Sequence, residues 1–286
     1  MKTYFECLPC MVRQALEGAR HATDDEAIHE EVLRRFLDIA ARADLSRPTP
    51  LLIGMVHRII RDITGNPDPY RGAKDHFNST AFSLYPQFKA RVEASPDPVE
   101  AALRLANAGN CLDMIVDANL ESADIQGAME ELMTLPVPPD VVTHFKMLTE
   151  RARTILYLGD NAGEIVFDRL LIEQLPRDKI TYAVRGFPVI NDVTLVDART
   201  IGMTDVVPVV DNGSDMPGTI LEECSAEFRE RFHRADLIIS KGQGNYEAIS
   251  DAEANIFFIF RAKCEVITLH LGYPVGSPVF LVNTRR

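Results

Sequence analysis

The sequence predicts an α/β protein in which a helical N-terminal region precedes a mainly parallel sheet. From residue 11 to about residue 150, apolar residues recur at steps of three and four, as in amphipathic helices, and no convincing strand is present. After residue 150, short β-rich runs alternate with helical segments. Such alternation requires crossover connections, so it indicates parallel strands with helices on both faces. We therefore expect a helical bundle, residues 1–150, packed on a Rossmann-like α/β/α sandwich, residues 151–286.

The spacing of apolar residues predicts the helices of the N-terminal region. The clearest spans 50–65, because Pro50 suits the first turn of a helix and Gly65 suits its C-terminal cap. A proline-rich break precedes the last helix of the region. The predicted helices cover 11–20, 30–45, 50–65, 85–95, 98–110 and 138–152.

In the second half, β-branched and aromatic residues gather in short apolar runs that predict strands. Two longer segments between them have helical spacing, 164–175 and 219–235. The predicted strands cover 154–159, 180–186, 206–210, 236–242, 256–262 and 279–283.

Composition excludes several classes of protein. The net charge of −12 over 286 residues argues against general binding to nucleic acid or to an anionic membrane, although one cationic pocket could still bind an acidic small molecule. The N-terminus lacks the apolar segment of a signal peptide, and no apolar run approaches the roughly 20 residues that span a bilayer. We expect a soluble, cytoplasmic protein, and the sequence does not indicate its oligomeric state.

Polar loops follow four of the predicted strands. In open α/β sheets, ligands bind beyond the carboxyl ends of the strands, so these loops are the natural place for a site. The candidates are Asp160, Asn161 and Glu164 after the first strand; Arg185 at the end of the second strand, with Asn191 and Asp192 after it; Gly213 and Ser214 after the third; and Lys241 and Gly242 at the end of the fourth, with Asn245 after it.

These residue types suit metal-assisted chemistry on a phosphorylated small molecule. Carboxylate and carboxamide oxygens are the ligands that Mg²⁺, Mn²⁺ and similar divalent ions prefer. Lysine and arginine suit a phosphate, and glycines allow backbone N–H groups to approach phosphate oxygens at a helix N-terminus.

Each loop also has a simpler interpretation. Asp160 or Asn161 could cap the helix that follows, as could the Asn191–Asp192 pair, while Lys241 could be a solvated strand end and 211–215 an ordinary turn. Their joint occurrence in consecutive loops favours a functional site. There is no G-x-x-x-x-G-K-[ST] motif, and "GQGNYE" is too short for a dinucleotide fingerprint.

Taken together, the ordered motifs resemble one known family, the DUF89 damage-control phosphatases or ARMT1-like group. The motifs are "GDNAGEIVFD", "RGFPVINDVTLVDA", "NGSDMPGT" and "SKGQGNYEAI". The segments "CLPC", "GNPDPYRGAKDHFN", "NAGNCLDM" and "FRAKCEVIT" are similar to its prokaryotic CxxC-bearing subfamily I. The resemblance covers nearly the whole chain, and its specificity lies in the ordered set of motifs.

The resemblance implies a metal-dependent phosphatase that acts on sugar phosphates and related metabolites with Mn²⁺, Co²⁺, Ni²⁺ or Mg²⁺. The family's metal ligands correspond to Asp160, Asn161 and Asp192, with Asp197 as a rival for the third position. The lysine of the "SKG" motif, Lys241, is expected at the phosphate. The sequence departs from the family pattern at Cys111, which we expect to have only a packing role.

The mechanism leaves several roles open at this stage. Glu164 and Asp192 are both candidates to orient or deprotonate the attacking water. Lys241, with Arg185 and the backbone N–H groups of Gly213 and Ser214, would neutralise the phosphoryl oxygens. A phosphoaspartyl route through Asp160 is a chemical alternative, although the D-x-D pattern of such enzymes is absent.

The helical region is expected to supply a lid or a substrate wall. Its polar candidates are Asn110, which ends the helix predicted over 98–110, Asp113, which follows it, and Asp75 with Asn78. Capping of helix ends is the simpler interpretation for each.

The cysteines leave a second site open. Cys7 and Cys10 form a C-x-x-C pair that is compatible with a metal, a redox pair or plain packing, with Cys224 and Cys264 as possible distant partners. An odd total of five cysteines does not resemble a secreted disulfide framework.

Two other functions compete with a phosphatase. A non-catalytic sensor could bind phosphometabolites in the same pocket. A Rossmann-type methyltransferase or oxidoreductase is weakened by the missing glycine fingerprint.

Overall fold

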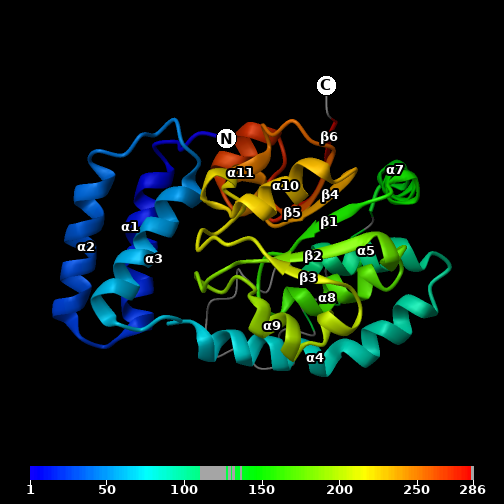
Figure 1. The fold of residues 1–286 in the computed structure, drawn as a ribbon, viewed down its shortest axis with the longest axis horizontal. Helices are drawn as coiled ribbons and strands as arrows, with labels where there is room; N and C mark the ends of the chain where they lie inside the picture. The colour runs from blue at the N-terminus through cyan, green and yellow to red at the C-terminus, as the bar shows by residue number, and fades with distance from the viewer. Residues whose placement is uncertain (110–126, 128–129, 131–132, 136, 285–286) are drawn as a thin grey trace.

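A single twisted sheet organises the chain. The computed structural model describes residues 1–109, 127, 130, 133–135 and 137–284, and it contains a six-stranded sheet in the order β3-β2-β1-β4-β5-β6 (Figure 1). Strands β1 to β5 pair in parallel, and β6 pairs antiparallel with β5. The strands are β1 Ile155–Leu158, β2 Ile180–Val184, β3 Val209–Asp211, β4 Leu237–Lys241, β5 Ile256–Arg261 and β6 Pro278–Asn283.

Side chains alternate between two hydrophobic cores along each central strand. In β1, Ile155 and Tyr157 belong to one core, whereas Leu156 and Leu158 belong to the other. This is the period of two expected for a pleated strand. All four residues are buried because helices cover both faces.

Helices from both halves of the chain cover the sheet. One face packs against α4 Arg71–Glu93, α5 Pro98–Gly109, α7 Pro139–Arg151, α8 Glu164–Ile172 and α9 Leu195–Thr200. The other face packs against α10 Ala226–Arg234, α11 Gln243–Ile249 and α12 Glu265–Leu271. Part of the N-terminal region therefore completes the sandwich.

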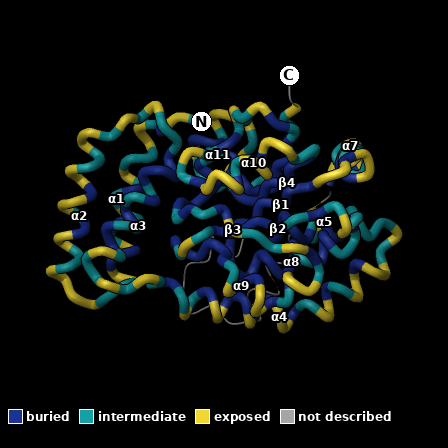
Figure 2. Tube along the Cα trace, in the orientation of Figure 1, coloured by how far each residue is buried: buried dark blue, intermediate teal, exposed yellow. Residues whose placement is uncertain are grey.

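The first three helices form a separate bundle with its own core. Residues of α1 Cys7–Ala22, α2 Glu26–Ala40 and α3 Thr49–Thr64 pack around Met11, Phe36 and Val56. The bundle lies at one end of the molecule, and its outer faces are exposed, whereas strands β1, β2, β4 and β5 are almost entirely buried (Figure 2). Among the helices of the described residues, none is sufficiently long and apolar to cross a membrane.

The structure confirms the α/β class and all six strands, but it moves several boundaries. The strand predicted over 206–210 forms only at Val209–Asp211. The helix predicted over 219–235 is interrupted, because the Ser225 side chain accepts from the Phe228 N–H and starts α10 there. The helix expected to start near Pro86 begins at Arg71 and contains Pro86 internally, since its first half is anchored by buried residues.

Ion pairs fasten the bundle to the sheet. Arg58 donates from Nε to both carboxylate oxygens of Asp215, at 3.1 and 2.9 Å, and from Nη2 to Glu223 at 2.9 Å. Arg61 contacts the same aspartate and also donates to the Pro188 carbonyl oxygen at 2.9 Å. Both arginines lie on α3, so one carboxylate from the loop after β3 holds two cations of the bundle.

We expect Asp215→Asn to lower the free energy of unfolding by about 1–2 kcal/mol. The Asp215 side chain is 14% exposed and that of Arg58 is 41% exposed, so the loss should lie between that of an exposed and that of a buried ion pair. Urea unfolding would measure it. Glu227→Gln is the control, since its pair with Arg231 is exposed; equal losses in the two variants would contradict the docking role.

Candidate metal and phosphate site

A cavity of about 530 Å³ lies between the bundle and the carboxyl edge of the sheet. The strand order of the sheet reverses between β1 and β4. Ligands of such sheets usually bind at this point, beyond the carboxyl ends of the strands. The sheet side of its lining includes Asp160, Asn161, Asn191 and Asp192, and the opposite wall comes from α1, α3 and the start of α4. The structure therefore brings the candidates after β1 and β2 to one cavity.

The proposed metal ligands Asp160, Asn161 and Asp192 lie on two adjoining loops. An antiparallel bridge joins the backbones of Asn161 and Asp192. It is supported by hydrogen bonds from Ala162 N–H to the Asn191 carbonyl oxygen and from Val193 N–H to the Asp160 carbonyl oxygen, each 2.8 Å. Two loops that follow different strands are thus held in register at the cavity.

Hydrogen bonds also orient the Asn161 amide. Its Nδ2 donates to Asp160 Oδ2 at 3.1 Å and to Glu164 Oε1 at 2.9 Å. The amide oxygen is therefore the atom that remains to face a cation, and oxygen is the ligand that Mg²⁺ or Mn²⁺ prefers.

Arg185 links the carboxylates that face the cavity. Its Nε donates to Asp192 Oδ2 at 2.6 Å, and its Nη2 lies 3.8 Å from Asp160 Oδ1. Arg185 is only 2% exposed and is not among the residues that line the cavity. Arg185 therefore contacts both aspartates from outside the residues that line the cavity.

Lys241 is likewise buried behind the site. Its Nζ donates to Glu164 Oε2 at 3.3 Å and to Asp168 Oδ1 at 2.7 Å, and all three side chains are fully buried. Burial alone would lower the pKa of Lys241, but Asp168, Glu164 and Asp160 outweigh it and raise the pKa. Neither Lys241 nor Glu164 is among the residues that line the cavity.

The charges of this buried region do not balance. Among the described contacts of the cluster, four carboxylates, those of Asp160, Glu164, Asp168 and Asp192, pair with two buried cations, Arg185 and Lys241. Buried charges are costly unless they are compensated. The excess of two formal negative charges, with oxygen donors at the cavity, fits a divalent cation.

Other predicted residues have structural roles. Asn245 is fully buried; it donates to the carbonyl oxygens of Gly159 and Lys241 and accepts from Thr219. The Gly213 N–H donates to the Asp211 side chain and the Ser214 N–H to the Asn212 side chain. Gly242 supports the site differently, because its missing side chain leaves room for Asp160.

The rival ligand Asp197 belongs to a helix cap. It forms a capping box with Thr194 at the start of α9 and accepts from Arg71 and Asn78. Burial favours a raised pKa, but Lys74, Arg71 and Thr194 prevail and lower the pKa of Asp197.

The described candidates of the helical region, Asp75 and Asn78, are not among the residues that line the cavity. Asn78 accepts from the Gly163 N–H at 2.8 Å, so it ties α4 to the loop after β1. Asp75 is exposed and pairs with Arg71. Asn110, Cys111 and Asp113 lie outside the described residues.

Sequence reasoning missed the cationic and helical parts of the cavity wall. Lys263 lines the cavity, and it belongs to the "FRAKCEVIT" segment that carries the family resemblance, which could have indicated it. His57 also lines the cavity; burial and then Arg61 lower its pKa to about 3, so it is neutral at ordinary pH. The bundle residues gave no local signal, because their role depends on where the bundle docks.

The cysteine pair does not assemble a metal centre of the usual kind. Cys7, Cys10, Cys224 and Cys264 have free thiols, and burial raises the pKa of the Cys7 thiol. Within the described ranges, no three side chains of His, Cys, Asp or Glu are placed to hold a metal ion. The triad above differs, because one of its three ligands is an amide.

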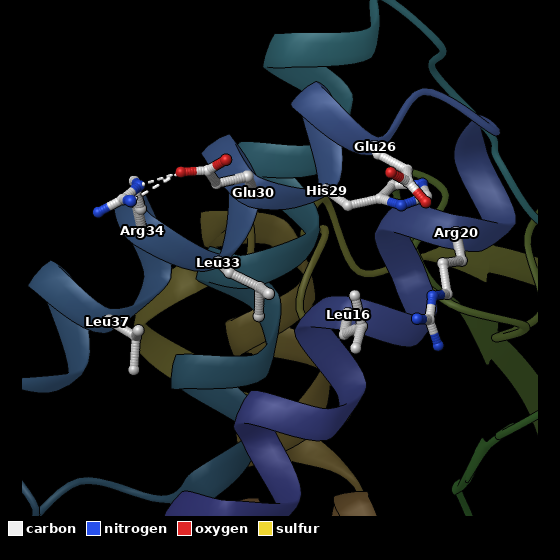
Figure 3. Close-up of a pocket in the computed structure, with 8 residues that line it drawn as sticks. All are labelled: Leu16, Arg20, Glu26, His29, Glu30, Leu33, Arg34 and Leu37. Carbon is white, nitrogen blue, oxygen red and sulfur yellow. Dashed lines mark hydrogen bonds and ion pairs between the residues drawn. The ribbon is translucent and has the colours of Figure 1, made fainter.

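A second hollow lies on the bundle surface, between α1 and α2 (Figure 3). Leucines such as Leu16 and Leu33 form its apolar part, and the charged residues at its rim include Arg34 and Glu30, which pair with each other at 2.7 Å. It has none of the strand-end residues, so it does not compete with the first cavity as a catalytic site.

Comparisons with known proteins show similarity along nearly the whole chain. A sequence model described as the damage-control phosphatase ARMT1-like domain matches residues 3–279. The chain is 33% identical to a damage-control phosphatase of Archaeoglobus fulgidus, covering 96% of both, and 30% identical to one of Pyrococcus horikoshii, covering 99% of both. A crystal structure of a DUF89 family protein from Pyrococcus horikoshii superposes with a TM-score of 0.90 at 29% identity, over 99% of this chain and 100% of the other.

Proposed function

The chain belongs to the damage-control phosphatase ARMT1-like family, and from this premise we propose that it is a metal-dependent phosphomonoesterase of small metabolites. The substrates would be sugar phosphates or related damaged phosphometabolites. The observation that carries the proposal is the buried cluster with two excess negative charges at a cavity that also has a lysine in its wall.

Asp160, Asn161 and Asp192 would hold a divalent ion, Mn²⁺, Co²⁺, Ni²⁺ or Mg²⁺. When bound, such an ion supplies Lewis-acid charge to the phosphoryl oxygens. Arg185 keeps the two aspartates in place through its contacts of 2.6 and 3.8 Å. Asp192 lines the cavity and Glu164 does not, so Asp192 is the better placed of the two to orient the attacking water. The reaction transfers the phosphoryl group to water and releases the metabolite alcohol and inorganic phosphate.

Lys263 would bind the phosphate in place of the buried Lys241. We expect Lys263→Met to lower kcat/KM about 10- to 100-fold, because a charge-assisted hydrogen bond to an anion is worth about 1.5–3 kcal/mol. Inhibition by inorganic phosphate should weaken in parallel, and steady-state kinetics would measure both effects. Lys146→Met is the control, since Lys146 lies on α7 and pairs with Asp97; similar kinetics in the two variants would contradict the assignment.

The proposal as a whole is tested by a screen of phosphorylated metabolites against these four metals. We expect hydrolysis that depends on added metal and stops with EDTA. Binding of phosphometabolites without turnover would instead favour a sensor.

A further inference from the structure

A fully buried cluster lies behind the metal ligands, on the side away from the cavity. Its centre is Asp168 on α8. Asp168 Oδ1 accepts from Lys241 at 2.7 Å and from Tyr157 at 2.8 Å, and Oδ2 accepts from Tyr182 at 2.9 Å. None of these four side chains has more than a trace of exposure. The cluster joins α8 to β1, β2 and β4 underneath the site.

The cluster continues to the cavity through two further contacts. Lys241 also donates to Glu164 at 3.3 Å, and Glu164 accepts from the Asn161 amide at 2.9 Å. Glu164 therefore receives Lys241 on one oxygen and Asn161 on the other. Any change in how Lys241 is shared between Asp168 and Glu164 reaches the amide that faces the cavity.

The donors of the cluster keep their protons. Burial, followed by Asp168, raises the pKa of both Tyr157 and Tyr182 well above the usual value, so both stay hydroxyl donors at neutral pH. The carboxylate of Asp168 is thus fixed by three donors. Stability alone does not explain a buried ionic network of this kind, because an apolar replacement is often as stable. A role in positioning the residues of the site would explain it.

We propose that Asp168 is a positioning residue, which through Lys241 and Glu164 holds the Asn161 amide with its oxygen toward the cavity. The inference rests on the proposed function, since it assumes that Asn161 ligates the metal. Groups behind metal ligands commonly set ligand orientation, and their loss weakens metal binding about 10- to 100-fold.

The test compares Asp168→Asn with Glu173→Gln. Glu173 follows the last residue of α8 and is bound by Lys89, Tyr85 and Arg169, a similar set of donors far from the cavity. The readouts are the Mn²⁺ dissociation constant, from the electron paramagnetic resonance signal of free Mn²⁺, and kcat at limiting and at saturating Mn²⁺. Both variants should lose stability, but only Asp168→Asn should lose Mn²⁺ affinity, by about tenfold, and excess Mn²⁺ should largely restore its kcat.

The outcomes separate the two proposals. If the wild-type protein binds Mn²⁺ and is active, but Asp168→Asn binds Mn²⁺ as tightly as Glu173→Gln does, the inference is overturned and the function stands. If the wild-type protein binds none of Mn²⁺, Co²⁺, Ni²⁺ and Mg²⁺, both are overturned. Should Asp168→Asn not fold, Tyr157→Phe decides, because it removes one donor and no charge; it should weaken Mn²⁺ binding by about twofold or more, and unchanged binding would overturn the inference.

Discussion

Asp160→Asn should lower metal-dependent phosphatase activity by about 10²- to 10³-fold, the range found when one preorganised electrostatic group is removed from a site. Asp160 combines a position at the cavity with contacts to two other residues of the site. It lines the cavity, accepts from the Asn161 amide and lies 3.8 Å from Arg185. The substitution keeps the size of the side chain and removes one negative charge. Steady-state kinetics with Mn²⁺ and a phosphate monoester would measure the loss.

The same variant should be at least as stable as the wild-type protein when no metal is present. The cluster has two more carboxylates than cations, so removal of one charge relieves repulsion among the remaining three. Sites that bind ligands often sacrifice stability in this way. Thermal unfolding in EDTA would therefore show an equal or higher Tm for Asp160→Asn.

Added Mn²⁺ should raise the Tm of the wild-type protein above that of Asp160→Asn. A ligand that binds only the folded state raises the Tm, and we expect this rise in the wild-type protein but little of it in Asp160→Asn. Asp97→Asn is the control, because Asp97 pairs with Lys146 at a distance from the cavity. Full activity of Asp160→Asn, or an undiminished Mn²⁺-induced shift, would mean that the metal is bound elsewhere.

The sheet, and the position of Asp160, Asn161 and Asp192 at one cavity, could be predicted from sequence because both depend on local patterns. Apolar runs of strand length identify the strands, and parallel strands place all their carboxyl ends at one edge. Asp160 and Asp192 follow adjacent strands, so their proximity at the cavity follows from topology alone.

The roles of the basic residues could not be predicted in the same way. Lys241 ends β4 and Lys263 lies two residues after β5, and no local pattern indicates which of the two side chains turns inward. In the structure, Lys241 turns inward because Asp168 and Glu164 bind it inside the sandwich, whereas Lys263 lines the cavity. A buried lysine needs carboxylates from other elements. From the sequence, Glu164 is considered as a group that activates water, and Asp168 is not considered.

The cavity wall from the bundle depends on long-range docking. His57 lies on an ordinary amphipathic helix, and its helical spacing predicts only that one face is buried. It becomes part of the cavity because Arg58 and Arg61 pair with Asp215, more than 150 residues later in the chain. No pattern within α3 contains that information.

Gly242→Ala should inactivate the site although it substitutes none of the proposed metal ligands. Gly242 follows β4 and has φ of 81°, a conformation that residues with a side chain rarely adopt. A Cβ atom built on it would lie 1.9 Å from Asp160 Oδ2 and 2.2 Å from Asp160 Cγ. The methyl group and the carboxylate cannot both occupy this space, so Asp160 must leave its position or the loop must shift.

Gly242→Ala combines two destabilising effects, the strain of a positive φ and the clash with Asp160. A substitution at a second glycine, Gly272, separates them. Gly272 has φ of 77° and no atom within 4 Å of a built Cβ, so Gly272→Ala reports backbone strain alone, about 1–2 kcal/mol. Gly242→Ala should lose more stability than that.

The functional readouts complete the comparison. In Gly242→Ala, kcat/KM should fall about 10²-fold or more, as for misplaced catalytic groups generally, with weaker Mn²⁺ binding, while Gly272→Ala keeps both. Kinetics and Mn²⁺ titration on the two variants would measure this. If Gly242→Ala loses only as much stability as Gly272→Ala and still binds Mn²⁺, then Asp160 does not need the position that the structure gives it. If the losses appear as expected, a residue with no side chain is as necessary to the metal site as the carboxylate it accommodates, because the two compete for one volume.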